Sequence, residues 1–70
     1  MKIDLGAPEG NAIELGGITY RVARQCGLSE KAAKDILSDM RAGTYIDLLN
    51  VMDREFPGLF QFHGDPRVKR

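Results

Sequence analysis

Arg21 and Arg24 are the residues of this chain best suited to binding an anion. Guanidinium groups form paired hydrogen bonds with phosphate oxygens, and side chains three positions apart share one face of a helix. Tyr20 precedes them and offers a ring on which a nucleobase could stack. These residue types predict a nucleotide pocket, and a polar helix face with ordinary salt bridges is the alternative interpretation.

Backbone amides at the start of the same helix could add to this anion site. The segment "GAPEGN", residues 6–11, leads into a helix start, where amide groups are unpaired and carry partial positive charge. Gly10 and Asn11 would supply these amides. The segment matches neither the Walker phosphate loop nor the dinucleotide fingerprint, and Glu9 and Glu14 would repel an anion. A simple helix cap is therefore the alternative to a ligand site.

Catalytic and metal chemistry are not indicated. One Cys and one His among 70 residues give too few ligands for a zinc site. Cys26 falls on a predicted apolar stripe, so we expect it to be buried as a small hydrophobe rather than paired with His63 as a nucleophile. The acidic residues look like solvated helix faces rather than paired carboxylates. We therefore expect no enzyme, no metal and no cofactor.

The charge distribution bears on nucleic-acid binding and on location. Ten Lys and Arg residues balance ten Asp and Glu residues, and positive charge gathers only in the last residues, at Arg67, Lys69 and Arg70. Without a basic face, DNA binding by a helix-turn-helix arrangement is not expected. No apolar run approaches the roughly 18 residues that cross a bilayer, and a single cysteine indicates no disulfide framework. We expect a cytoplasmic protein without membrane contact.

Three helices are predicted to position these residues, at about residues 11–26, 29–43 and 44–56. Each begins at a side chain suited to capping and ends near a glycine or a Pro-Gly pair. Apolar side chains recur at spacings of three and four along each helix. In the first helix this stripe comprises Leu15, Ile18, Val22 and Cys26, and in the third it comprises Tyr45, Leu48, Leu49, Met52 and Phe56.

Short strands are predicted at both ends of the helices. "KIDL" alternates polar and apolar residues, and "LFQFH" places Phe60 and Phe62 on one face. We predict an α+β domain, mostly helical, in which short N-terminal and C-terminal strands form a small antiparallel pair. The domain is expected to span residues 1–64, followed by a flexible basic tail over residues 65–70. A two-stranded pair is marginal alone and should lie against the helices or extend into a neighbouring subunit.

Gly16 and Gly17 lie inside the first predicted helix. A glycine costs about 1 kcal/mol relative to alanine in a helix interior, so this pair suggests the close approach of a backbone or a ligand. A chain this short also buries only about 60% of the surface that its unfolded form exposes. Homo-oligomerisation is therefore expected.

Two segments, "PEGNAIELGG" and "AGTYIDLLNVMDREFPG", carry a resemblance to a known group of proteins. The chain resembles short phage and prophage proteins that pair a Gly-Asn-Ala helix start with a later "SGDY…LL" segment ending near a Phe. The matching residues lie within about residues 3–62, and Thr44 replaces the usual Asp. The resemblance implies a small accessory viral protein, and such proteins often counter host defence.

The leading functional hypothesis is a non-enzymatic counter-defence protein that sequesters a nucleotide-like immune signal as a homo-oligomer. The ligand would be a cyclic or linear nucleotide bound by the Gly10 and Asn11 amides and by the side chains of Tyr20, Arg21 and Arg24. The alternative is a protein-binding inhibitor of a host defence complex, of the anti-CRISPR type or similar, which docks an acidic helix face or a strand edge. A structural or regulatory phage protein is a third possibility.

Overall fold

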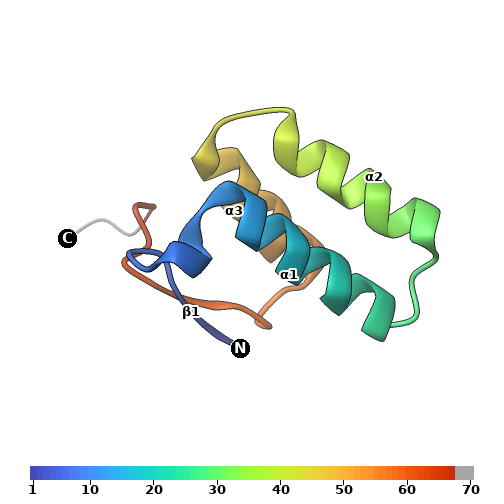
Figure 1. Cartoon of the computed structure of the whole chain (residues 1–70), viewed down its shortest axis with the longest axis horizontal. Helices are drawn as coiled ribbons and strands as arrows, with labels where there is room; N and C mark the ends of the chain where they lie inside the picture. Colours follow the sequence, from blue (N-terminus) through green and yellow to red (C-terminus); the bar gives the residue numbers. More distant parts are fainter. Residues whose placement is uncertain (68–70) are drawn as a thin grey trace.

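The computed structural model describes residues 1–67 and consists of three helices with two short strands (Figure 1). This confirms the predicted mostly helical α+β class, and each helix lies close to its predicted bounds. The elements in chain order are β1 (Lys2–Asp4), the 3-10 turn η1 (Pro8–Gly10), α1 (Ala12–Gln25), α2 (Glu30–Arg41), α3 (Tyr45–Glu55) and β2 (Gln61–His63). Only η1 was not anticipated.

Side-chain caps set the helix starts. The Asn11 side-chain oxygen accepts a hydrogen bond from the Glu14 amide at 2.8 Å, and Ser29 caps α2 in the same way. At α3 the Thr44 hydroxyl accepts from the Asp47 amide, while the Asp47 carboxylate accepts from the Thr44 amide at 2.9 Å. These bonds satisfy amides that have no partner inside the helix, which is why the starts can be read from sequence.

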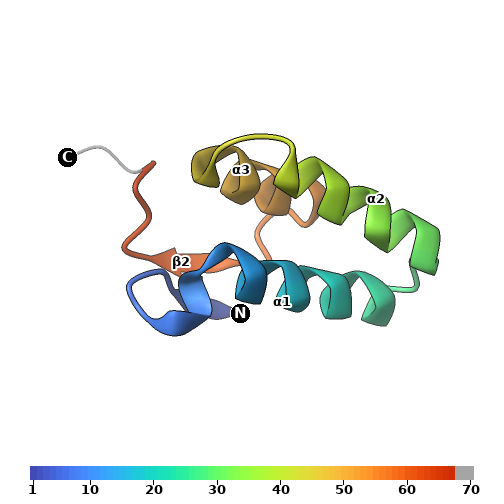
Figure 2. The same cartoon turned by 45° about the horizontal axis from the view of Figure 1, so that its top comes forward.

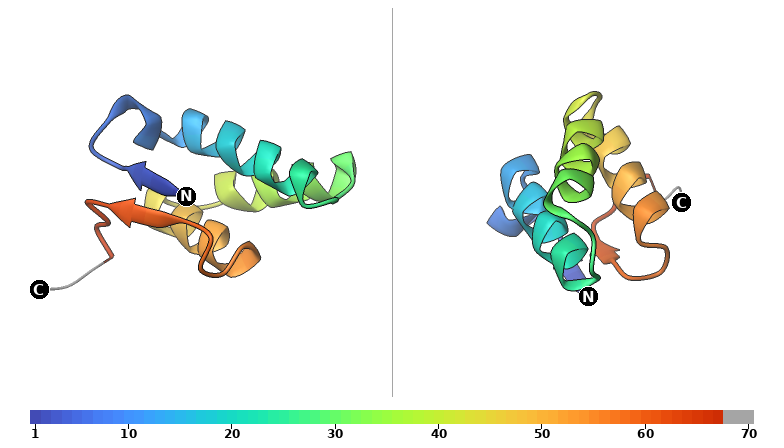
Figure 3. Two further views of the ribbon diagram at one scale, coloured as in Figure 1. Left: turned by 90° about the horizontal axis from the view of Figure 1, so that it is seen from below. Right: turned by 90° about the vertical axis from the view of Figure 1, so that its right-hand side faces the viewer.

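The two strands pair in parallel, so the predicted antiparallel pairing is wrong. Ile3 lies opposite Phe62, and the ladder continues with the Leu5 amide donating to the His63 carbonyl at 2.9 Å. The chain reverses direction between each pair of consecutive elements from β1 through the three helices to β2. The first and last of these elements therefore run the same way, as the two arrows in Figure 3 show.

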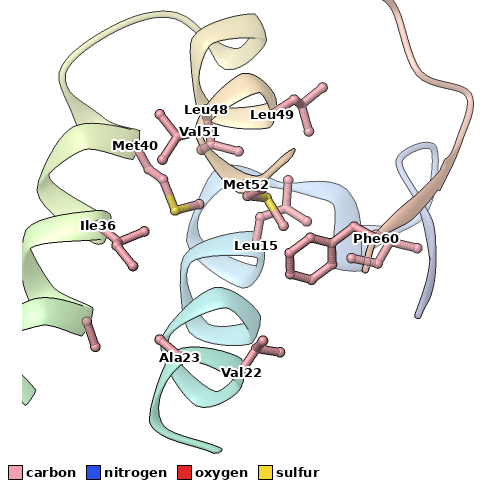
Figure 4. Close-up of a cluster of buried hydrophobic side chains, with 12 residues drawn as sticks. Leu15, Val22, Ala23, Ile36, Met40, Leu48, Leu49, Val51, Met52 and Phe60 are labelled. Carbon is pink, nitrogen blue, oxygen red and sulfur yellow. The ribbon is translucent and has the colours of Figure 1, made fainter. Parts of the chain in front are cut away.

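The core lies between the three helices and one face of the strand pair (Figure 4). Leu15, Leu49 and Met52 are fully buried, and the buried Thr19 satisfies its hydroxyl by donating to the Leu15 carbonyl at 2.8 Å. The full set of buried apolar residues is Ile3, Leu15, Val22, Ala23, Ala33, Ile36, Met40, Leu48, Leu49, Val51, Met52 and Phe60. Every element except η1 contributes to it or packs against it.

The end of α1 corrects the predicted apolar stripe. Cys26 is exposed rather than buried, because it is the C-cap residue, at the point where the chain leaves the helix. Gly27 follows with a φ of +92°, and the Leu28 amide donates to the Ala23 carbonyl at 3.0 Å. This turn folds the half-buried Leu28 against the core in place of Cys26. Ile18 is likewise only half-buried.

Residues 65–67 contact α3 through one arginine, while residues 68–70 of the predicted basic tail lie outside the described residues. The Arg67 guanidinium binds the Asp65 carboxylate at 2.6 Å and the Asp53 carboxylate at 2.7 Å. It also donates to the Asn50 side chain at 3.0 Å and lies 5.5 Å from the centre of the Phe62 ring. We call these five residues the C-terminal clamp.

Arg67 and Asp65 of the clamp are largely buried, and each shifts the pKa of the other. The Arg67 and Asp65 side chains are only 19% and 11% exposed. Hydrogen bonds from Arg67 lower the pKa of Asp65 below its ordinary value, and the bond to Asp65 raises the pKa of Arg67. The described part of the C-terminal segment is thus held by charge-assisted hydrogen bonds.

Helices α1 and α2 lie next to one another, and α3 packs against α2 behind them (Figures 1 and 2). The connection between α1 and α2 is at one end of the molecule, and β2 lies toward the other end (Figure 2).

Among residues 1–67, none of the helices has both the length and the apolar character that a membrane span requires.

Candidate functional site

The segment before α1 uses its own amides. The Gly10 amide donates to the Ala7 carbonyl at 2.9 Å, and the Asn11 amide donates to the Pro8 carbonyl at 3.2 Å. The Asn11 side chain donates to that same carbonyl and caps α1. Both amides that the sequence suggested as phosphate ligands are therefore engaged within η1 and its flanks.

Packing explains why Gly10 is a glycine. A Cβ atom at this position would lie 2.5 Å from the Leu5 Cα and carbonyl oxygen, too close for any side chain. The Tyr45 hydroxyl donates to the Gly10 carbonyl, which ties the segment to α3. Burial, together with the negative charge of Asp65, raises the pKa of Tyr45 above its ordinary value. The glycine-rich segment is thus a closed structural unit.

The other predicted ligands point in different directions. Arg21 and Arg24 are exposed on α1, whereas Tyr20 is half-buried and faces α2. Arg21 borders a separate hollow beside Lys2 and Glu9. Tyr20 borders a hollow between α1 and α2, and Arg21 does not, so the two residues do not share a pocket within a single chain. The structure does not bring the five predicted site residues together.

A groove of about 610 Å³ runs between α1 and α2 and ends at the start of α3. We call it the α1/α2 groove. Its apolar lining comes from Ala12, Ile13, Leu37, Met40 and Leu48, and its polar lining from Tyr20, Arg41, Thr44 and Tyr45, with Gly16, Gly17 and Gly43 between them. Of the residues predicted to bind a ligand, Tyr20 alone lines it.

The two glycines of α1 open this groove. A Cβ atom on Gly16 would lie 3.6 Å from the Leu37 side chain, an ordinary contact, and one on Gly17 would meet nothing within 4 Å. Packing within the chain therefore does not require glycine at either position. The sequence predicted that this pair permits a close approach. At Gly17 no group of the described chain makes such an approach, so the approaching group would have to come from another molecule.

Two polar groups of the groove have no partner among residues 1–67. The Tyr20 hydroxyl makes no hydrogen bond there, and the Arg41 guanidinium makes neither a hydrogen bond nor an ion pair. The other charges of α2 are paired, either along the helix, as in the 3.1 Å contact between Lys31 and Asp35, or with Arg54 of α3, as for Asp39. Tyr20 and Arg41 are therefore available to a ligand from opposite walls of the groove.

Sequence reasoning missed Arg41 and Ile13 as candidate residues. Arg41 lies in the last turn of α2, 21 positions after Tyr20, and no local spacing links the two. Ile13 is 87% exposed although it is a large apolar residue. Its position between the predicted cap and the apolar stripe was the available signal, because an isoleucine outside the core face of an amphipathic helix needs another contact.

Among the described residues, no group of three or more His, Cys, Asp or Glu side chains could hold a metal ion. No protein-family model, curated protein or solved structure shows a significant match to this chain. The resemblance to phage proteins stays a prediction based on the two quoted segments. The candidate functional surfaces are therefore the α1/α2 groove and the face of α1 beside it.

Proposed function

We propose that this chain is a non-enzymatic binding protein that takes a nucleotide-like ligand into the α1/α2 groove and sequesters it. The observation that supports this proposal is a groove of about 610 Å³ with an unengaged tyrosine on one wall and an unengaged arginine on the other. Small-molecule sites commonly measure about 300–1,000 Å³ and combine an apolar lining with a few polar groups.

The lining suits the parts of a nucleotide. A base can stack on Tyr20 above the open backbone of Gly16 and Gly17, and the phosphate can bind the Arg41 guanidinium. The apolar side chains between them exclude water from the base. Arg41 thus takes the role that the sequence suggested for Arg21 and Arg24.

The resemblance to phage proteins supplies the biological setting of the proposal. In the cytoplasm of a host cell, a protein of this kind would deplete a nucleotide immune signal by binding it one-to-one in excess, with no turnover. The ligand class would then be cyclic or linear nucleotides.

Calorimetric titration and thermal unfolding with cyclic mononucleotides, cyclic dinucleotides and linear nucleotides test this proposal. With the nucleotide that binds, Arg41→Gln should lose about 1.5–3 kcal/mol of binding free energy, which is about tenfold or more in affinity. Arg24→Gln, which changes an exposed arginine outside the groove, is the matched control. A flat response to every nucleotide, or equal losses in the two variants, would contradict the proposal.

A protein-binding inhibitor is the second candidate, and the apolar lining favours it. Ile13, Leu37, Met40 and Leu48 could hold the apolar face of an amphipathic helix from a host defence protein. This function predicts co-purification with a defined host protein and no change in melting temperature with any nucleotide. Leu37→Asp should abolish the co-purification, whereas Arg41→Gln should leave it largely intact.

A further inference from the structure

The outward face of α1 has no partner within the described chain except at its edge, where Tyr20 packs against the core. It consists of Ile13, Glu14, Gly17, Tyr20, Arg21 and Arg24. These residues lie within about 60° of Gly17 around a helix of about 3.6 residues per turn. All are exposed except the half-buried Tyr20, whereas Leu15 and Val22 on the other side of α1 are buried.

An exposed apolar side chain stands beside a gap on this face. Ile13 is 87% exposed, well above the 53% of Met1, which is the next most exposed large apolar residue among residues 1–67. Gly17, one turn further along, leaves open space where a side chain would be. Gly17 allows a second backbone to approach closely, and Ile13 offers apolar area beside it, so this surface can pack against a copy of itself.

Negative and positive charges lie at opposite ends of this face. Glu14 lies toward the N-terminus of α1, and Arg21 and Arg24 lie toward its C-terminus. Within residues 1–67, none of these three side chains takes part in an ion pair. An antiparallel copy of the helix would bring opposite charges together at both ends.

We infer that a second copy of this chain docks here, with its α1 antiparallel and a two-fold axis beside Gly17. Glu14 and Arg21 lie on one flank of the face, and Ile13 and Tyr20 lie on the other. The axis sets Glu14 opposite Arg21 of the second copy and Ile13 opposite Tyr20 of the second copy. Each contact occurs twice, and the two Gly17 backbones meet at the centre.

A parallel arrangement does not fit the same residues. A two-fold axis along α1 exchanges the flanks, which places Glu14 against Ile13 of the second copy and leaves the carboxylate over an apolar side chain. Antiparallel helices also align their dipoles favourably.

The inference goes beyond the proposed function and does not depend on a ligand. Because Ile13 and Tyr20 also line the α1/α2 groove, the second copy would border its mouth.

A symmetric disulfide tests the position of the axis. At a two-fold axis a residue lies next to its own copy, so Gly17→Cys in a Cys26→Ser background should form a covalent dimer under mild oxidation. Ser38→Cys in the same background is the control, since Ser38 is exposed on α2, away from this face. Preferential cross-linking at position 17 supports the inference, and equal or absent cross-linking at both positions contradicts it.

Charge exchange tests the antiparallel pairing through the mass of the full chain in solution, measured by sedimentation over a range of concentrations. Glu14→Arg and Arg21→Glu should each raise the dimer dissociation constant about tenfold, and the double variant should restore it to near the original value. Ile13→Asp should give a monomer, whereas Ile46→Asp on α3 should not. A wild-type chain that is monomeric up to millimolar concentration, or a double variant no better than either single one, overturns the inference.

Nucleotide titration and sedimentation of the wild-type chain, taken together, separate this inference from the proposed function. If the wild-type chain dimerises but responds to no nucleotide, the inferred dimer is supported and the proposed ligand is contradicted. If it binds a nucleotide but stays monomeric, the proposed ligand is supported and the inferred dimer is contradicted.

Discussion

Two glycine-containing regions of this small protein lie within ten residues of one another and differ in almost every contact. Around Gly10 the backbone amides donate to carbonyls of the same segment, and a Cβ atom would collide with Leu5. Around Gly17 the helix faces open space, and the charged side chains beside it are unpaired within the described chain. Glycine at the first position serves internal packing, whereas no contact within the described chain requires it at the second.

The arginines repeat this difference. Arg67 binds two carboxylates and a side-chain amide and lies over the Phe62 ring, so its role in holding the C-terminal segment is structural. Arg21, Arg24 and Arg41 are exposed, without a paired acid among residues 1–67. The number of arginines in the sequence does not distinguish Arg67 from the exposed arginines, because the difference lies in the partners of each side chain.

The largest effect is expected from Gly10→Ala. The added methyl group would need to displace the Leu5 backbone, so the free energy of unfolding should fall by about 2–4 kcal/mol. Urea denaturation followed by circular dichroism measures this loss. A variant as stable as the wild type would show that the segment is looser than the structure indicates, and would reopen it as a ligand site.

Arg67→Ala should be the next most damaging change. It leaves Asp65 largely buried without its partner, and it should destabilise the fold by about 1–3 kcal/mol. Arg24→Ala, on the open face of α1, should change stability by less than about 0.5 kcal/mol when the chain is monomeric. Equal losses in the two variants would remove the distinction between the clamp and that face.

The clamp also predicts a dependence of stability on pH. The folded-state pKa of Asp65 is lowered, so its contribution is fully present above its unfolded pKa of about 3.9 and is lost as the pH falls through the folded value. Wild-type stability should therefore fall more between about pH 5 and pH 2 than that of Asp65→Asn. Parallel urea midpoints for the two proteins over that range would contradict the assignment.

The smallest effect is expected from Gly17→Ala, and it has the opposite sign to Gly10→Ala. The new Cβ atom meets no neighbour, and alanine favours the helix by up to about 1 kcal/mol, so the monomeric chain should become more stable. Thermal unfolding at low protein concentration measures this gain. Destabilisation of the monomer would mean that Gly17 has an internal contact after all.

Much of the fold follows from short-range patterns in the chain. Asn11, Ser29 and Thr44 cap the helices where their types and spacing indicate. The candidate site was harder to predict from the sequence. Of the five residues predicted to bind a ligand, Tyr20 alone lines the α1/α2 groove, and Arg41 had no local signal because it reaches the same groove from another helix.

The sequence by itself determined the helices, their caps and the existence of two short strands, because hydrogen bonds and side-chain periodicity within a helix act over three or four residues. Only the tertiary structure decided the parallel pairing of β1 with β2, the exposure of Cys26 and the contacts of Arg67. It also decided which glycine is enclosed and which is open. These features depend on segments that are distant in the chain, where the order of chain reversals and the packing of side chains outweigh local preference.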